Sequence, residues 1–350
     1  MIRLTWLQFR AQAVTAAAAL AAFAALLAAT GPHMASLYAA SGLSSCRGGS
    51  CPNLAGYFLM QLQTGGYTFL YLISVTSILL APAVIGLFWG APLIARELET
   101  GTSPLAWNQS VTRTRWLTVK LTLIGLAAMA VTEALSLMQT WWAVPLGRAV
   151  ADGAPSNILA QGRFTQLVFA THGITPLGYA AFAFTLGVTA GALIRRTIPA
   201  MAVTLAIFAA VQVAMPLWIR PNFAPPHRTA ISVASMGHVA GGATGPGGST
   251  FTLVATSLPS QPGAWILSSG PVNAAGRPVS TTPAACTALS AERSFSAFPD
   301  CLASQGIREA VTYQPASRYW PFQWTETAIY LALALAMAGY CFRRLNHRRS

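Results

Sequence analysis

Two ionisable side chains stand inside long apolar stretches of this chain, where a carboxyl and an imidazole could bind a cation or exchange a proton. Glu133 lies nine residues before Trp142, and His172 lies nine residues after Arg163, so both are expected at a similar depth in one half of a membrane. An acid near the centre of a bilayer costs roughly 2.5–3.5 kcal/mol. A contact between Glu133 and His172 would relieve that cost, and a cavity facing Glu133 would attract a cationic ligand. A protonated Glu133 and a structural bond between helices are alternatives of similar weight.

A polar connector at residues 96–120 is the second group of candidate residues, because it separates two long apolar runs. Its acids suit a basic partner, Gly101 would break a helix, and Trp107 would anchor a contact. The alternative is a solvated loop at a membrane surface. A docking surface is favoured because a loop without a partner does not need apolar residues such as Leu98 and Leu105. The candidate residues are Arg96, Glu97, Glu99, Gly101, Thr102, Trp107, Arg113, Arg115 and Lys120.

Cysteine spacing predicts two disulfides in an oxidising compartment. Cys46 and Cys51 share one predicted outer loop, and Cys286 and Cys301 share another, whereas Cys341 stands alone. A metal site is less favoured, because no His lies near either pair at ligand spacing. The bridge between Cys286 and Cys301 is predicted to stabilise its loop by about 3 kcal/mol.

The elements that must position these residues are transmembrane helices. Charged residues are 8% of the 350, hydrophobic residues are 54%, and mean hydropathy is +0.52, which excludes an ordinary soluble protein. A bilayer core about 30 Å thick requires about 20 apolar residues per helix. A cleaved signal peptide is the rival interpretation of the first apolar stretch, but its loss would put the Arg-rich ends on opposite sides of the membrane. Six segments qualify as spans: 11–30, 68–94, 116–142, 164–194, 197–219 and 325–342.

Basic residues predict the orientation of these spans. With the N-terminus inside, the inner segments hold twelve Lys or Arg against two acids, and the outer segments hold nine against five. We therefore expect a multi-pass protein of the cell membrane with both termini in the cytoplasm. The net charge of +13 then reflects inner-face topology, and no nucleic-acid partner is expected.

The predicted fold class is an all-α polytopic membrane protein. Its membrane domain covers residues 1–219, with an interfacial N-terminal helix, spans 1–5 and a cytoplasmic loop at 95–116. Residues 220–322 are predicted to form a small mixed extracellular domain stapled by a disulfide, and residues 323–350 the sixth span with a basic cytoplasmic tail. Within the extracellular domain, runs at 251–258 and 264–268 look like strands, whereas 301–312 looks helical.

Two pairs of glycines are spaced for close helix packing. Gly86 and Gly90 form one GxxxG motif, and Gly187 and Gly191 form another. Such motifs serve either packing within a chain or a dimer interface, and packing within a chain is the commoner use.

The order of these features resembles the permeases of the ABC type-2 family, the membrane subunits of ATP-driven exporters. Glu97 followed by Gly101-Thr102 resembles the pattern of that family after its second span, and residues 110–115 with Lys120 resemble the stretch that enters its third. The large outer segment between spans 5 and 6 and the helix before span 1 also fit the family.

This resemblance implies a mechanism and partners. Such permeases act as dimers, with a second copy or a sister permease, and each half docks a cytoplasmic ABC ATPase. The chain has no GxxxxGK[ST] motif, so no cofactor is expected on it, and ATP and Mg²⁺ would bind the partner ATPase. Membrane lipid is the remaining expected partner. The connector would then couple ATP hydrolysis to export of an amphiphilic substrate such as a drug, antibiotic, peptide or lipid.

Two other classes of protein remain as alternatives. A membrane-embedded transferase requires clustered acid–base or nucleophilic groups, and only Glu133 with His172 could supply such a pair. A receptor or regulatory membrane protein would sense its signal through residues 220–322. A transporter subunit, not itself an enzyme, is the favoured class.

Overall fold

The structure is a computed structural model that describes residues 2–46, 51–99, 113–154, 157–235, 239–244, 250–255, 258, 261–287 and 297–347. The chain divides into two compact units. The helical unit comprises residues 1–160, 166–220 and 321–350, and the sheet unit comprises residues 161–165 and 221–320.

Six helices of the described chain are long and apolar enough to cross a membrane, which confirms the predicted fold class. A helix meets this need because it bonds its own backbone groups, for which a bilayer offers no partners. The six regions are Phe9–Ala40, Tyr67–Arg96, Leu117–Trp142, Thr175–Ile194, Thr197–Asn222 and Ala316–Arg344. They lie in α1 (Ile2–Ala40), α3 (Tyr67–Ile85) with η2 (Gly86–Gly90) and α4 (Ala91–Glu99), α6 (Arg113–Trp142), α9 (Thr175–Ile194), α10 (Thr197–Ala214) with η3 (Met215–Ile219) and η4 (Arg220–Asn222), and η8 (Ala316–Arg318) with α13 (Tyr319–His347).

The fourth span is shorter than the sequence predicts. The expected helix at 164–194 is interrupted by a turn at Gly173, which has a φ of 77°, a value that favours glycine. Before the turn lies the short helix α8 (Gln166–Thr171), and after it α9 begins with Pro176 in its first turn. The Oε1 atom of Gln323 accepts the backbone N–H groups of Ile174 and Thr175 at 3.1 Å each, and so it caps α9.

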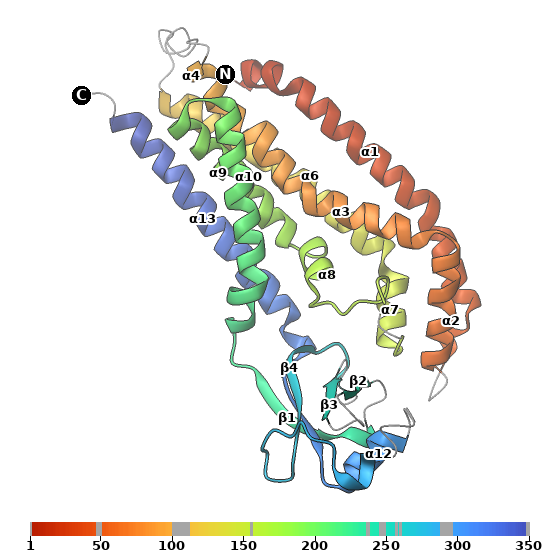
Figure 1. Cartoon of the computed structure of the whole chain (residues 1–350). Helices are drawn as coiled ribbons and strands as arrows, with labels where there is room; N and C mark the ends of the chain where they lie inside the picture. Colours follow the sequence, from red (N-terminus) through yellow and green to blue (C-terminus); the bar gives the residue numbers. More distant parts are fainter. Residues whose placement is uncertain are drawn as a thin grey trace. The chain divides into compact units, whose positions relative to one another are not determined.

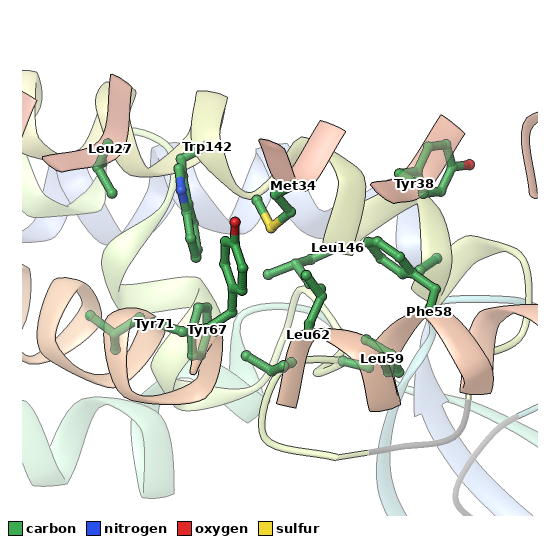
Figure 2. Close-up of a cluster of buried hydrophobic side chains, with 14 of the residues drawn as sticks. Leu27, Met34, Tyr38, Phe58, Leu59, Leu62, Tyr67, Tyr71, Trp142 and Leu146 are labelled. Atoms are coloured by element: carbon green, nitrogen blue, oxygen red, sulfur yellow. The ribbon is translucent and has the colours of Figure 1, made fainter. Parts of the chain in front are cut away.

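The first helix is continuous from Ile2 to Ala40, so the residues expected to form a separate interfacial helix are its first turns. Besides α8, the shorter helices between spans in the described chain include η1 (Leu43–Ser45), α2 (Cys51–Thr64) and α7 (Val144–Ala151). Figure 2 shows the apolar cluster where α1, α2, α3, α6 and α7 meet, with Met34, Phe58 and Trp142 almost fully buried. This cluster anchors one end of the helical unit.

The two GxxxG motifs pack against each other within the chain. A Cβ at Gly90 would lie 2.5 Å from the Phe184 carbonyl oxygen, and one at Gly191 would lie 2.5 Å from the Ala91 carbonyl oxygen, which are closer approaches than a side chain tolerates. The π-helical turn of η2 lies at this crossing. The glycines therefore serve the contact between α3–η2–α4 and α9, the most buried of the six spans.

The sheet unit contains two antiparallel sheets (Figure 1). One has the order β1 (His227–Ser232), β5 (Arg308–Gln314), β4 (Trp265–Val272), and the other pairs β2 (Val239–Thr244) with β3 (Thr250–Ala255). Short helices η5 (Val233–Ser235), η7 (Ala284–Cys286) and α12 (Ala297–Ser304) complete its described elements. Their side chains form a separate apolar core around Phe251, Phe298 and Leu302.

One expectation for this unit is wrong, and two are confirmed. The helix expected at 301–312 ends at Ser304, and residues 308–314 form β5 instead, because Ala310, Val311 and Thr312 complete the ladders of both β1 and β4. The strands predicted near 251–258 and 264–268 are β3 and β4. Both predicted disulfides, Cys46–Cys51 and Cys286–Cys301, are formed, and Cys341 is free and buried.

Candidate functional site

The connector begins within α4, and Glu99, the last residue of this helix, is bonded to the start of α10. The Glu99 Oε2 atom accepts the Thr197 hydroxyl at 2.7 Å and the Thr197 backbone N–H at 3.2 Å. The hydroxyl bond chiefly, then the N–H bond, lowers the pKa of the exposed Glu99 carboxyl, and nearby Arg196 acts in the same direction. The carboxylate therefore stays charged at neutral pH and caps the N-terminus of α10.

The same bond joins the connector to the turn between α9 and α10. Arg195 ends α9 with a φ of 60°, the one non-glycine residue with a positive φ in the described chain. Thr197 then begins α10, so Glu99 contacts the second helix of a tight helical hairpin. A displacement of α4 would reach α10 directly through this contact.

Only some of the other predicted coupling residues have described side chains. Arg96 in α4 and Arg115 in α6 are exposed, whereas Lys120 in α6 is only 3% exposed. The side chains of Glu97 and Arg113 lie outside the described residues, as do Gly101, Thr102 and Trp107. A coupling role for all these residues stays a prediction, and burial makes Lys120 the least suited to touch another subunit.

Glu133 lies on α6 with one carboxyl oxygen, Oε2, buried and without a hydrogen-bond partner in the described chain. His172 is not in a span but in the turn between α8 and α9. Its Nδ1 atom lies 3.0 Å from the Thr171 hydroxyl and 3.1 Å from the Val168 carbonyl oxygen. No hydrogen bond joins Glu133 to His172 among the described residues, so the structure does not bring the two candidates together as a pair.

The turn that holds His172 is nevertheless fixed against α6. The Ser136 hydroxyl donates to the Gly173 carbonyl at 2.9 Å, and the Gln323 side chain donates to the carbonyl of His172 at 3.1 Å. Serine and glutamine therefore lock this turn between α6 and α13. His172 is part of a braced turn and not an exposed acid–base group facing Glu133.

A buried ion pair is the polar site that sequence reasoning missed. From the sequence, Arg220 and Glu326 count only among the charges of the outer segments, but both side chains are at most 1% exposed. Arg220 donates to both carboxylate oxygens of Glu326, at 2.7 and 2.9 Å. The pair links the end of the fifth span to the beginning of the sixth.

Neutral groups complete this site. The Tyr179 hydroxyl of α9 donates to Glu326, Gln166 of α8 accepts a third guanidinium bond at 2.9 Å, and the guanidinium lies 3.9 Å from the centre of the Phe169 ring. Every charged atom therefore has a close partner. The sequence signal was the position of one arginine and one glutamate at facing ends of consecutive apolar runs, with residues 221–320 between them.

The described polar groups mostly join one helix to another. No group of three or more His, Cys, Asp or Glu side chains that could hold a metal is found among the described residues. The Arg220–Glu326 pair is saturated by its partners, and no hydrogen bond joins Glu133 to His172 among the described residues. The arrangement therefore offers fixed links between helices and one unpaired carboxyl on α6.

Six helices that are long and apolar enough to span a membrane, with an inserted sheet unit, define a polytopic membrane protein. The family model for ABC-2 membrane transporter related proteins matches residues 17–220, and the chain belongs to this family. It is thus an ABC-type permease in general terms, a membrane subunit whose family has no ATPase site of its own and works with an ABC ATPase subunit. No curated protein and no solved structure matches the chain.

Proposed function

We propose that this chain is the permease subunit of an exporter, which moves an amphiphilic substrate across the cell membrane using ATP hydrolysed by a separate subunit. The observation that carries the coupling part is the bond from Glu99 to Thr197, because it ties the connector to α10. An ATPase bound to the connector would shift α4, and the capped N-terminus of α10 would follow. A pair of permeases with two ATPases is the proposed assembly.

The arrangement of α4 supports this proposal in a second way. The helix packs on α9 through Ala91 and Gly191 with no side chain between the backbones. Backbones in such close contact move as a unit, because no flexible side chain absorbs the displacement. A push on the connector would therefore reach α9 by packing and α10 by the Glu99 cap.

The test is to neutralise Glu99 in the permease co-expressed with its ATPase. Glu99→Gln is expected to leave the assembled complex intact and to lower substrate transport and substrate-stimulated ATP hydrolysis several-fold, since the amide is a weaker cap than the carboxylate. Thr197→Val removes the hydroxyl bond and keeps the backbone N–H bond, so it should lower transport in the same direction. Asp300→Asn, which neutralises an exposed acid of the sheet unit, is the matched control.

A charge reversal at Glu97 tests the ATPase contact itself. Glu97→Lys is expected to weaken binding of the ATPase, whereas Glu99→Gln should not. Unchanged transport by both variants, at equal abundance in the membrane, would contradict coupling through this connector. A permease that binds no ATPase under any nucleotide condition would contradict the proposed function as a whole.

A further inference from the structure

The face of α6 that carries Glu133 is exposed in the helical unit. Residues 123, 126, 130, 133 and 137 are spaced by three and four, so they form one stripe along the helix. Leu123, Leu126 and Leu137 in this stripe are 41%, 59% and 58% exposed, and Ala130 is also exposed. We call these five residues the Glu133 stripe.

The opposite face of the same helix is the one that packs. Ile124, Ala128, Leu135 and Trp142 are each at most 9% exposed and belong to the two apolar clusters of the helical unit. Glu133 therefore lies on the side of α6 opposite to its packed face. It is half-buried, with Oε2 covered and without a hydrogen-bond partner in the described chain.

Lipid is a poor neighbour for Glu133 itself. Glu133 precedes Trp142 by nine residues, so it lies about 14 Å along the helix from the end of the span, within the hydrocarbon depth of a bilayer. Ionisable side chains at such depth face a protein interior or a path for a charged ligand far more often than acyl chains. No described basic side chain forms an ion pair with Glu133, so its carboxyl has no charge partner within the described helical unit.

We propose that the Glu133 stripe binds a cationic amphiphile, whose charged head contacts the Glu133 carboxylate and whose apolar body lies along Leu126, Ala130 and Leu137. This inference rests on the proposed function and names its substrate class. The chemistry is complementary in both parts, since leucine side chains match the apolar body and the carboxylate matches the charge. A second copy of the chain suits the stripe less, because a two-fold contact between identical stripes would bring two Glu133 carboxyls together.

The test is equilibrium binding to the purified full-length permease in lipid nanodiscs without its ATPase. The probes are the methyltriphenylphosphonium cation and triphenylphosphine oxide, which share three phenyl rings but differ in charge. The wild type is expected to bind the cation at least about tenfold more tightly than the neutral probe. Glu133→Asp should keep this preference, Glu133→Gln should lose it, and Asp300→Asn should behave as the wild type.

Three results would overturn the proposal: no binding of the cation by the wild type, equal preference for the cation in Glu133→Gln, or a disulfide between two copies of Leu137→Cys in the membrane. Each glutamine or aspartate variant is first checked for monodisperse elution, because these near-isosteric changes should preserve the fold. Because the ATPase is absent, failure of coupling through Glu99 would leave this binding unchanged. If the cation does not bind but ATP hydrolysis is still coupled to transport through Glu99, only the proposed substrate class is wrong.

Discussion

At the scale of residues, Arg220 and Glu326 form an ion pair that is almost completely buried. Two charges that are at most 1% exposed have left water, and the bidentate contact, Tyr179 and Gln166 compensate for that loss. Breaking such a pair is costly because the remaining charge stays buried and unpaired, whereas removing both charges costs far less. The pair thus specifies how the fifth and sixth spans meet.

We predict that Arg220→Met and Glu326→Leu each destabilise the helical unit by about 3–5 kcal/mol, and that the double variant recovers most of this loss. Chemical denaturation of the permease in mixed micelles would measure the change. Arg277→Met, at an exposed arginine of the sheet unit, is the control and should be near neutral. Equal and additive losses in the two single variants would contradict a coupled pair.

A second residue-scale feature is Glu309, an acid in the core-facing row of β5. It is fully buried, opposite Ile231 and Pro271 in the neighbouring strands. Burial raises its pKa to about 7, and the nearby Ser269 hydroxyl offsets only part of this rise, since neither carboxyl oxygen has a hydrogen bond of normal geometry in the described chain. Below about pH 7, the folded sheet unit therefore favours the protonated form of Glu309.

The sign of the resulting pH dependence follows from linkage. In the folded state Glu309 keeps its proton up to about pH 7, whereas in the unfolded state it releases the proton near pH 4.5. The contribution of Glu309 to the free energy of unfolding is therefore largest below pH 4.5 and falls as the pH rises towards 7. Hydrogen exchange of the β5 amides, corrected for intrinsic rates, should show opening at least about tenfold more frequent at pH 7.5 than at pH 4.5. Glu309→Gln should remove this difference, and a difference that persists in this variant would exclude Glu309 as its source.

At the scale of elements, the crossing of η2 with α9 depends on glycine. A Cβ at Gly86 would lie 2.7 Å from the carbonyl oxygen of Ala183, so a side chain there requires the helices to separate. The backbones instead meet directly, and the connector continues from this contact as α4. The contact that would transmit a displacement of α4 to α9 is thus formed by glycines.

We predict that Gly187→Ala destabilises the helical unit by about 1–3 kcal/mol, because its new methyl group would collide with the backbone of η2. Thermal unfolding in detergent would measure the effect. Gly339→Ala in α13 is the matched control, since no atom lies within 4 Å of the added Cβ, and it should be neutral or slightly stabilising. Similar melting temperatures for the two variants would show that the crossing tolerates a methyl group.

At the scale of the whole molecule, an even number of spans returns the two ends of the chain to one side. Figure 1 shows the beginning of α1 and the end of α13 at the same end of the helical unit as α4. Together with the excess of Arg in those segments, this arrangement favours a cytoplasmic location for both termini and for the connector.

We predict that a cysteine at exposed Arg277 reacts with a membrane-impermeant maleimide on intact cells, whereas a cysteine at exposed Arg10 reacts only after permeabilisation. The four native cysteines held in disulfides and the buried Cys341 should stay unlabelled. Labelling of both positions from outside would show that the number of spans, or the orientation of the first, is wrong.

The number of spans, both disulfides and the family could be predicted from the sequence, because each depends on a local pattern. Twenty apolar residues favour a membrane helix wherever they stand, and cysteines a few residues apart within one loop have few other partners. The local sequence pattern was not sufficient to distinguish a strand from a helix at residues 308–314. Residues 308–314 became β5 because β1 and β4 flank them, and that neighbourhood is not encoded within the segment.

Which polar residues contact each other depends on the tertiary structure. Arg220 and Glu326 are 106 positions apart, and only the packing of α9, α10 and α13 brings them together and removes them from water. Likewise, no hydrogen bond joins Glu133 to His172 among the described residues, because the turn at Gly173 is bonded to Ser136 and Gln323 instead. Spacing along a chain sets how far a side chain lies along its helix, whereas its partners depend on how the helices rotate and pack against each other.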